Sequence, residues 1–145
     1  IRRGYDLPVF ETAVSELRRR GIDVIVHTIL CLPGETKPDM LQTIQYLNRQ
    51  DIQGIKLQLL HILKDTDLAE IYASDPFPVP DPQEYYELLG ACISHLKPDI
   101  VIHRLTGDGP KELLTAPLWT CNKRQVLNQL QSYFKTHDIW QGKEY

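Results

Sequence analysis

The stretch VIVHTILCLPGETKPDMLQTIQYLNRQDIQGIKLQLL, residues 24–60, has the pattern of a strand, a helix and a second strand. Residues 24–30 form a nearly unbroken run of β-branched and apolar side chains, which is typical of a strand covered on both faces, as in a parallel sheet. Residues 55–60 alternate apolar and polar side chains like a strand. Between the two, apolar side chains recur at helical spacing at Met40, Ile44 and Leu47. The stretch therefore predicts a parallel βαβ unit.

On either side of this unit, the alternation of helices and strands continues. Apolar residues one helical turn apart predict a helix over residues 8–20. A second flanking helix starts near Asp81 and stops before Pro98. A third strand is expected over residues 100–105, and a last helix over residues 123–135. The order α-β-α-β-α-β-α predicts an α/β fold.

Composition sets limits on the class of protein. The chain has 145 residues, a net charge of -3 and 42% hydrophobic residues, which fits one globular domain over residues 1–145. No apolar run approaches the length of a membrane span, and the mild acidity argues against a strongly basic nucleic-acid module. The cysteines stand far apart, so we predict no metal site in this chain and expect a reducing, cytoplasmic compartment. Because the chain starts at Ile1 without a methionine, we expect it to be a piece of a longer protein.

The carboxyl ends of the predicted strands are where a ligand is expected, because parallel α/β folds bind ligands beyond those ends. This rule selects residues 31–36, 61–66 and 103–109. In the first segment, Glu35 could orient a ligand amine or hydroxyl, or it could only stabilise the start of the next helix. His61 ends a strand at this edge, and the sequence favours a ligand contact and a structural role for it equally. His27, inside the first strand, is interpreted as a hydrogen-bonded core residue rather than a ligand.

The third segment has the densest group of polar side chains: His103, Arg104 and Asp108. Arg104 could hold a phosphate or carboxylate in a bidentate manner, and Asp108 could hold a ribose hydroxyl, position Arg104 or act as an acid or base. The Gly-Asp-Gly sequence is also an ordinary turn. Lys111, Lys123 and Arg124 could contact phosphates, although a solvated surface is the simpler interpretation.

Several stretches together resemble the radical S-adenosylmethionine (radical SAM) enzymes. Residues 27–35, HTILCLPGE, resemble the fifth-strand motif of their barrel, in which a glycine usually stands at the position of Cys31. Residues 54–68 resemble the sixth strand and the loop after it, and residues 1–6 resemble the segment after the fourth strand. A closer similarity is to the YhcC/YtqA-like group, which is related to the Elp3 domain. It is carried by residues 55–57, 60–61, 103–111 and 114–119.

The resemblance covers essentially the whole chain and implies a fold. Radical SAM enzymes use a partial (β/α)6 barrel. This chain looks like the C-terminal half of such a TIM-like barrel, with about three parallel strands and flanking helices. The other half would carry the Cys-x3-Cys-x2-Cys motif that ligates a [4Fe-4S] cluster. In the family, this cluster reduces SAM to a 5'-deoxyadenosyl radical, which abstracts hydrogen from a substrate.

By position, the resemblance also implies two groups of ligand contacts. The contacts to SAM would come from Leu32, Pro33, Glu35, His61 and Leu63. The contacts to the substrate would come from His103, Arg104 and Asp108. The resemblance assigns no residue of this chain as a catalytic group or as a cluster ligand.

The function implied is that of the C-terminal portion of a radical SAM enzyme that depends on SAM and a [4Fe-4S] cluster. The relation to Elp3 implies a tRNA substrate and modification of a wobble uridine, with Lys111, Lys123 and Arg124 on the phosphates. Two alternatives stay open. One is a radical SAM enzyme that acts on a small metabolite or a protein side chain, and the other is a non-catalytic α/β interaction module. We expect the chain alone to be inactive, to self-associate through its free sheet edge, to have no membrane partner, and to need the N-terminal half of the same protein.

Overall fold

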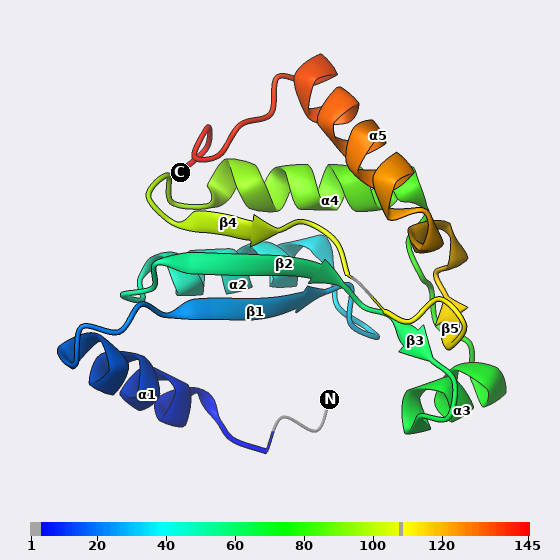
Figure 1. The fold of residues 1–145 in the computed structure, drawn as a ribbon, viewed down its shortest axis with the longest axis horizontal. Helices are drawn as coiled ribbons and strands as arrows, with labels where there is room; N and C mark the ends of the chain where they lie inside the picture. Colours follow the sequence, from blue (N-terminus) through cyan, green and yellow to red (C-terminus); the bar gives the residue numbers. More distant parts are fainter. Residues whose placement is uncertain (1–3, 108) are drawn as a thin grey trace.

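A parallel sheet of three strands organises the chain in a computed structural model, which describes residues 4–107 and 109–145. The strands lie in the order β1 (Ile25–Leu30), β2 (Gly54–Leu59) and β4 (Val101–Arg104) (Figure 1). Both neighbouring pairs are parallel, as the predicted βαβ unit requires. The predicted α/β class, with three parallel strands and flanking helices, is confirmed.

Helices connect the strands, and the central two pack on one face of the sheet (Figure 1). They are α2 (Lys37–Asn48) and α4 (Pro82–His95), while α1 (Leu7–Arg19) lies against α2 and α5 (Lys123–Thr136) lies against α4. A capping box starts α4, because the Glu84 amide donates to Asp81 Oδ1 and the Asp81 amide donates to Glu84 Oε2, both at 2.9 Å. Within the described ranges, no helix is long and apolar enough to cross a membrane.

The side chains of the strands alternate between two faces of the sheet, and the helices of residues 4–107 and 109–145 pack on only one of them. The covered face carries Leu30, Ile55, Leu57 and Leu59, which are at most 3% exposed. The other side, which we call the open face, carries Ile25, His27, Ile29, Gly54, Lys56, Gln58, Val101, His103 and Arg104. Ile25 and Ile29 are 41% and 40% exposed there. The expectation that the first strand is covered on both faces is therefore wrong for the described part of the chain.

The hydrophobic core lies between the covered face and the two central helices. From the helices it receives Met40, Ile44, Leu47, Tyr85 and Leu89, all of them buried. Burying a side chain of this size stabilises the fold by about 1.5–3 kcal/mol. The hydroxyl of Tyr85 donates to the carbonyl of Leu105 at 2.8 Å, so this buried polar group is satisfied, and α4 is tied to the segment after β4.

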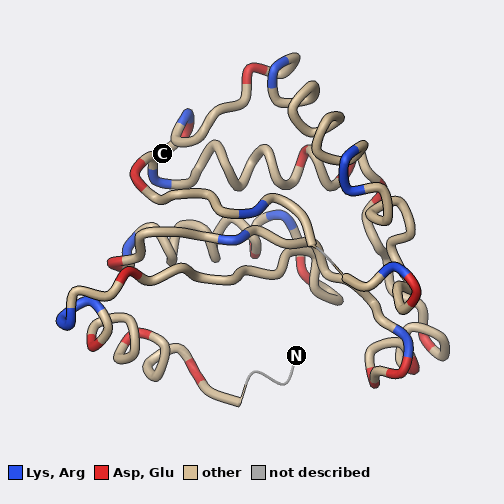
Figure 2. The backbone as a smooth tube through the Cα atoms, viewed as in Figure 1, with Lys and Arg blue, Asp and Glu red and all other residues tan. Residues whose placement is uncertain are grey.

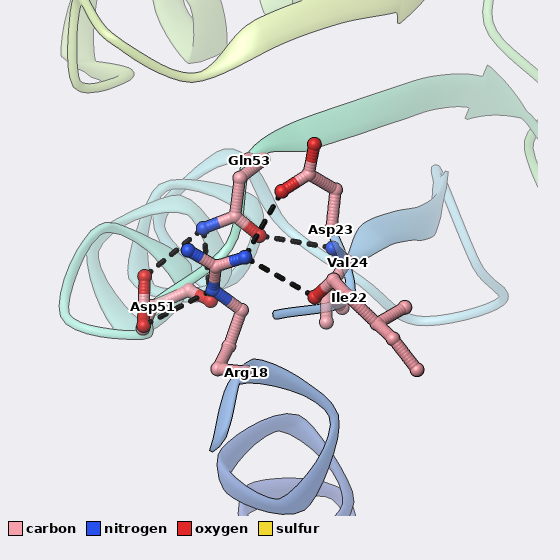
Figure 3. A network of polar contacts seen from close by, with 6 residues as sticks. All are labelled: Arg18, Ile22, Asp23, Val24, Asp51 and Gln53. Atoms are coloured by element: carbon pink, nitrogen blue, oxygen red, sulfur yellow. Dashed lines mark hydrogen bonds and ion pairs between the residues drawn. The ribbon is translucent and has the colours of Figure 1, made fainter. Parts of the chain in front are cut away.

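A network of polar contacts around Arg18, in the last turn of α1, holds the amino end of the sheet (Figure 3). The guanidinium donates to Asp23 Oδ1 at 2.9 Å and to Asp51 Oδ2 at 3.2 Å. Gln53 extends the network, since its Nε2 donates to Asp51 Oδ1 at 3.0 Å and its Oε1 accepts from the Val24 amide at 2.9 Å. These contacts join α1, the start of β1 and the segment between α2 and β2.

A smaller layer lies beyond the carboxyl end of the sheet (Figure 1). Here β3 (Ile62–Leu63) pairs antiparallel with β5 (Leu114–Ala116), next to α3 (Asp67–Ser74) and the short 3-10 helix η1 (Leu118–Cys121). Neither β3 nor β5 is predicted from the sequence, where residues 61–66 stand only as a segment expected to contact a ligand. Strands this short have no periodicity of their own, and their pairing depends on a partner distant in the sequence.

Candidate functional site

The carboxyl ends of the parallel strands bring the three predicted ligand segments to one edge of the sheet (Figure 1). Of the predicted segments 31–36, 61–66 and 103–109, the first two begin just past the ends of β1 and β2, and the third begins in the last two residues of β4. The Leu60 amide donates to the carbonyl of Leu30 at 3.0 Å, so β1 and β2 stay paired up to this edge. Strand direction alone predicted this common edge, and the parallel pairing confirms it.

The turn after β1 is shaped by the backbone of Cys31 and the side chain of Glu35. Cys31 has a φ of 64°, in the left-handed region that favours glycine, which accounts for the glycine usual at this position of the resembled motif. Glu35 Oε2 accepts a hydrogen bond from the Leu32 amide at 3.0 Å and so closes the turn. Glu35 therefore has a structural role, and its contact with a ligand stays a prediction, as do those of Leu32 and Pro33.

The environment of this turn favours the uncharged forms of its two titratable side chains. Burial raises the pKa of Glu35, although hydrogen bonds from the Leu32 and Cys31 amides oppose the shift. Burial, together with the negative charges of Glu35 and Glu84, raises the pKa of the Cys31 thiol to about 12. The Cys31 Sγ lies 4.0 Å from Met40 Sδ on α2. The thiol thus points toward the core and stays protonated at neutral pH.

His61 lies beneath the glycine-containing loop that follows β4. A Cβ atom added to Gly107 would meet the His61 ring at 2.6 Å, and one added to Gly109 would meet it at 2.9 Å. The Gly109 position also approaches the side chain of Leu63, at 3.4 Å. Residues predicted to contact SAM (His61 and Leu63) therefore lie directly against the loop that carries a predicted substrate contact. That contact, Asp108, lies outside the described residues.

Basic side chains form a row across the open face. The strand register pairs His27 with Lys56 and Lys56 with Arg104. A register shift makes His103 an extra residue in β4, so both His103 and Arg104 face the open side. The Arg104 Nη1 atom contacts Gln58 Oε1 at 3.4 Å. The predicted substrate residues His103 and Arg104 thus face the same side as Lys56, which the sequence analysis missed.

The interpretation of His27 as a core residue is wrong. It is exposed on the open face rather than buried in the core. Partial burial, followed by the charges of Lys56 and Arg104, lowers its pKa from the ordinary 6.5. The period-two alternation of residues 54–59 was the signal that could have found this face, since Lys56 and Gln58 lie opposite the buried leucines of β2.

The three predicted phosphate contacts lie away from the open face. Lys111 is exposed in the segment between Gly109 and β5, while Lys123 and Arg124 are the first two residues of α5. Cations in a first helical turn oppose the helix dipole, so their position adds no stability to α5. Their contact with phosphate stays a prediction.

The cysteines are not arranged to hold an iron–sulfur cluster. Cys92 is buried in the core, Cys31 points toward α2, and Cys121 lies in η1. The described ranges contain no group of three or more His, Cys, Asp or Glu side chains that could bind a metal ion. The residues present therefore do not fit a [4Fe-4S] cluster, which normally needs several thiolate ligands.

Comparison with known proteins identifies the family. Residues 52–136 match the family model of the Radical_SAM C-terminal domain. The chain is 34% identical over 143 residues to YtqA of Bacillus subtilis, covering 99% of this chain and 44% of that protein. It is 30% identical over 139 residues to YhcC of Escherichia coli K12, covering 96% of this chain and 45% of that protein. The chain thus spans less than half the length of these relatives.

A solved structure shows the same fold. An N-terminally truncated Elp3 from the archaeon Methanocaldococcus infernus superposes with a TM-score of 0.80 at 14% sequence identity. The match covers 97% of this chain and 33% of the Elp3 chain. The resemblance to the radical SAM enzymes and to the YhcC/YtqA-like group is therefore confirmed, and the chain belongs to the Radical_SAM C-terminal domain family.

Proposed function

We propose that this chain is the C-terminal part of a cytoplasmic radical SAM enzyme and that its open face lines the interior of a barrel. One observation carries the proposal: in the described residues no helix packs on the open face of the three parallel strands, and apolar and basic side chains are exposed or partly exposed there. Exposed apolar sheet surface is a liability unless another layer covers it. The preceding part of a partial (β/α)6 barrel would supply that layer and would hold the [4Fe-4S] cluster.

In this proposal the carboxyl edge of the sheet contacts SAM. SAM, when bound, supplies the radical that abstracts hydrogen from the substrate. Leu32, Pro33 and Leu63 offer apolar surface, Glu35 holds the turn after β1, and His61 supports the loop after β4. Arg104 and His103, which lie on the open face, would contact the substrate, and the contact expected from Asp108 stays a prediction from the sequence.

Formation of 5'-deoxyadenosine by the full-length protein tests the proposal. The protein is reconstituted anaerobically with iron and sulfide, reduced, and supplied with SAM. We expect 5'-deoxyadenosine from the full-length protein and none from the 145-residue chain alone. An intact cluster that yields no 5'-deoxyadenosine would contradict the proposal and would favour a non-catalytic interaction module.

For the substrate we propose tRNA, modified at a wobble uridine, on the strength of the resemblance to Elp3. Lys111, Lys123 and Arg124 would contact the phosphates. Changing all three to Ala should weaken tRNA binding and should lower the slope of log affinity against log salt by about 2, since each phosphate contact contributes ~0.7–0.9. Lys97→Ala is the control, because Lys97 pairs with Asp99 at 2.9 Å, before β4. A full-length protein that does not bind tRNA would rule this substrate out.

A small metabolite or a protein side chain is the second candidate substrate. The position of His103 and Arg104 on the open face favours it, because there they would line a compact pocket inside the barrel. Arg104→Ala should then abolish turnover without changing the affinity for SAM. Turnover that survives this substitution would contradict the placement of the substrate on the open face.

The free edge of β1 makes self-association of the isolated chain a further expectation. In the described residues, β1 pairs with β2 on one side only. Unpaired strand edges and uncovered apolar faces promote association. Light scattering at micromolar concentration should detect dimers or larger assemblies, and a clean monomer would contradict this expectation.

A further inference from the structure

In the row of His27, Lys56 and Arg104, the pairing of the two cations Lys56 and Arg104 is costly for the sheet. These residues are direct cross-strand neighbours, and strands in a sheet are about 4.8 Å apart. Like charges placed opposite one another destabilise a sheet. Figure 2 shows basic segments on both β2 and β4 where they run side by side.

The described residues place no acidic partner beside Lys56 or Arg104. The three strands contain no Asp or Glu, and no carboxylate of the described residues lies within 4.0 Å of Lys56 or Arg104. Arg18, at the amino end of the sheet, contrasts with them because it has Asp23 and Asp51 as partners. Arg18, Arg19 and Arg20 at the end of α1 thus have acidic partners, whereas Lys56 and Arg104 on the open face have none among the described residues.

The local backbone directs Arg104 to this face. Without the extra residue in β4, strand alternation would send Arg104 to the covered face. Gln58 then accepts from the guanidinium and holds it beside Lys56. Gly54 leaves room for the neighbouring His103, because a Cβ atom at Gly54 would lie 2.6 Å from the His103 Nε2 atom. The basic row therefore depends on specific backbone features as well as on composition.

We propose that His27, Lys56 and Arg104 bind a phosphate or carboxylate group of the substrate. This inference rests on the proposed function, because the open face must line the barrel interior for an anion to be enclosed there. Arg104 supplies a planar fork of donors and Lys56 a point charge. Ile25 and Ile29 lie on the same face and exclude water once they are covered. The exclusion of water strengthens the attraction between the anion and the two cations. His27, whose pKa is lowered by burial and then by the charges of Lys56 and Arg104, can donate a ring N–H.

The test measures binding of inorganic phosphate to the full-length protein with the cluster kept oxidised. The ring signals of isotopically labelled His27 serve as the probe. Phosphate should shift these signals saturably and should raise the pKa of His27, because an anion offsets the field of the two cations. Lys56→Gln and Arg104→Gln should each weaken phosphate binding at least tenfold. Arg104→Lys, which keeps the charge and loses the fork, should weaken it less.

Two controls separate this site from other sources of the same effect. Lys135→Gln, on an exposed lysine near the end of α5, should leave phosphate binding unchanged. The affinity for SAM, measured separately, should change less than twofold in Lys56→Gln and Arg104→Gln. Both variants remove cross-strand repulsion, so their melting temperatures should not fall below that of the natural protein.

Three results would overturn the inference. The row is not an anion site if phosphate does not bind, or if it binds both variants as well as the natural protein. If SAM affinity falls tenfold together with phosphate affinity, the row holds the carboxylate of SAM and not the substrate. None of these results depends on 5'-deoxyadenosine formation, so the proposed function can fail or hold independently.

Discussion

The two faces of the sheet use the same three strands for different purposes. On the covered face, Leu30, Ile55 and Leu57 are completely buried under α2 and α4. On the open face, Ile29 is 40% exposed and Lys56 and Arg104 face one another without an acidic partner among the described residues. The covered face therefore supplies stability, whereas the open face lowers stability and keeps charge available for a ligand.

The largest effect should come from a buried leucine of the covered face. Leu57, in the central strand, is 0% exposed, so Leu57→Ala should lower the free energy of unfolding by about 3 kcal/mol. The matched variant Ile29→Ala, on the open face of β1, should cost less than about 1 kcal/mol in the 145-residue chain. Urea denaturation measures both, and equal costs would mean that the two faces do not differ as described.

A smaller loss should follow from crowding the loop over His61. In Gly107→Ala, the new methyl group would lie 2.6 Å from the His61 ring, which should cost about 1–3 kcal/mol. The double variant Gly107→Ala with His61→Ala removes the clash and should recover part of that loss. Thermal unfolding of the single and double variants gives the coupling energy, and strictly additive effects would show that the ring and the loop do not touch.

Loss of the Arg18 contacts at the amino end of the sheet should lower the free energy of unfolding by a smaller amount. Arg18 bridges Asp23 and Asp51, whose side chains are 74% and 68% exposed. Exposed ion pairs are worth little, so Arg18→Ala should cost about 1 kcal/mol or less, with a smaller cost at high salt. SAM affinity of the full-length protein should not change. A tenfold loss of SAM affinity would show that the amino end is coupled to the site.

The smallest effect is a change in the pKa of His27. Partial burial and the charges of Lys56 and Arg104 lower this pKa in the folded chain, so the folded state binds fewer protons than the unfolded state. The associated stability is present above about pH 6.5 and is lost as the pH falls through the lowered pKa. Lys56→Gln should raise the pKa of His27 in an NMR titration. An unchanged pKa would mean that the two side chains do not share a face.

Much of the covered face could be predicted from the sequence, because apolar periodicity reports burial directly. The βαβ unit of residues 24–60 follows from this periodicity, and the start of a helix near Asp81 follows from its capping residues. The open face could not be predicted in this way. Ile25 and Ile29 are as apolar as core residues, so residues 24–30 have the same pattern as a strand covered on both sides.

Two features of the candidate site could not be predicted from sequence patterns. Strand direction identified the three segments at the carboxyl edge, and the resemblance pointed to Arg104. The register shift that turns Arg104 toward Lys56 has no sequence signal, because it arises from pairing with β2. The packing of His61 beneath Gly107 depends in the same way on contacts between distant segments.

The central claim is that the preceding part of the full-length protein covers the open face. Hydroxyl-radical footprinting measures this directly, by comparing the oxidation of Ile25, Ile29 and Val101 in the 145-residue chain and in the full-length protein. These side chains are 41%, 40% and 58% exposed in the structure. The account predicts strong oxidation in the chain alone, at a dilution at which it is monomeric, and protection of all three in the full-length protein. Equal oxidation in both would contradict it, because the open face would then be an outer surface.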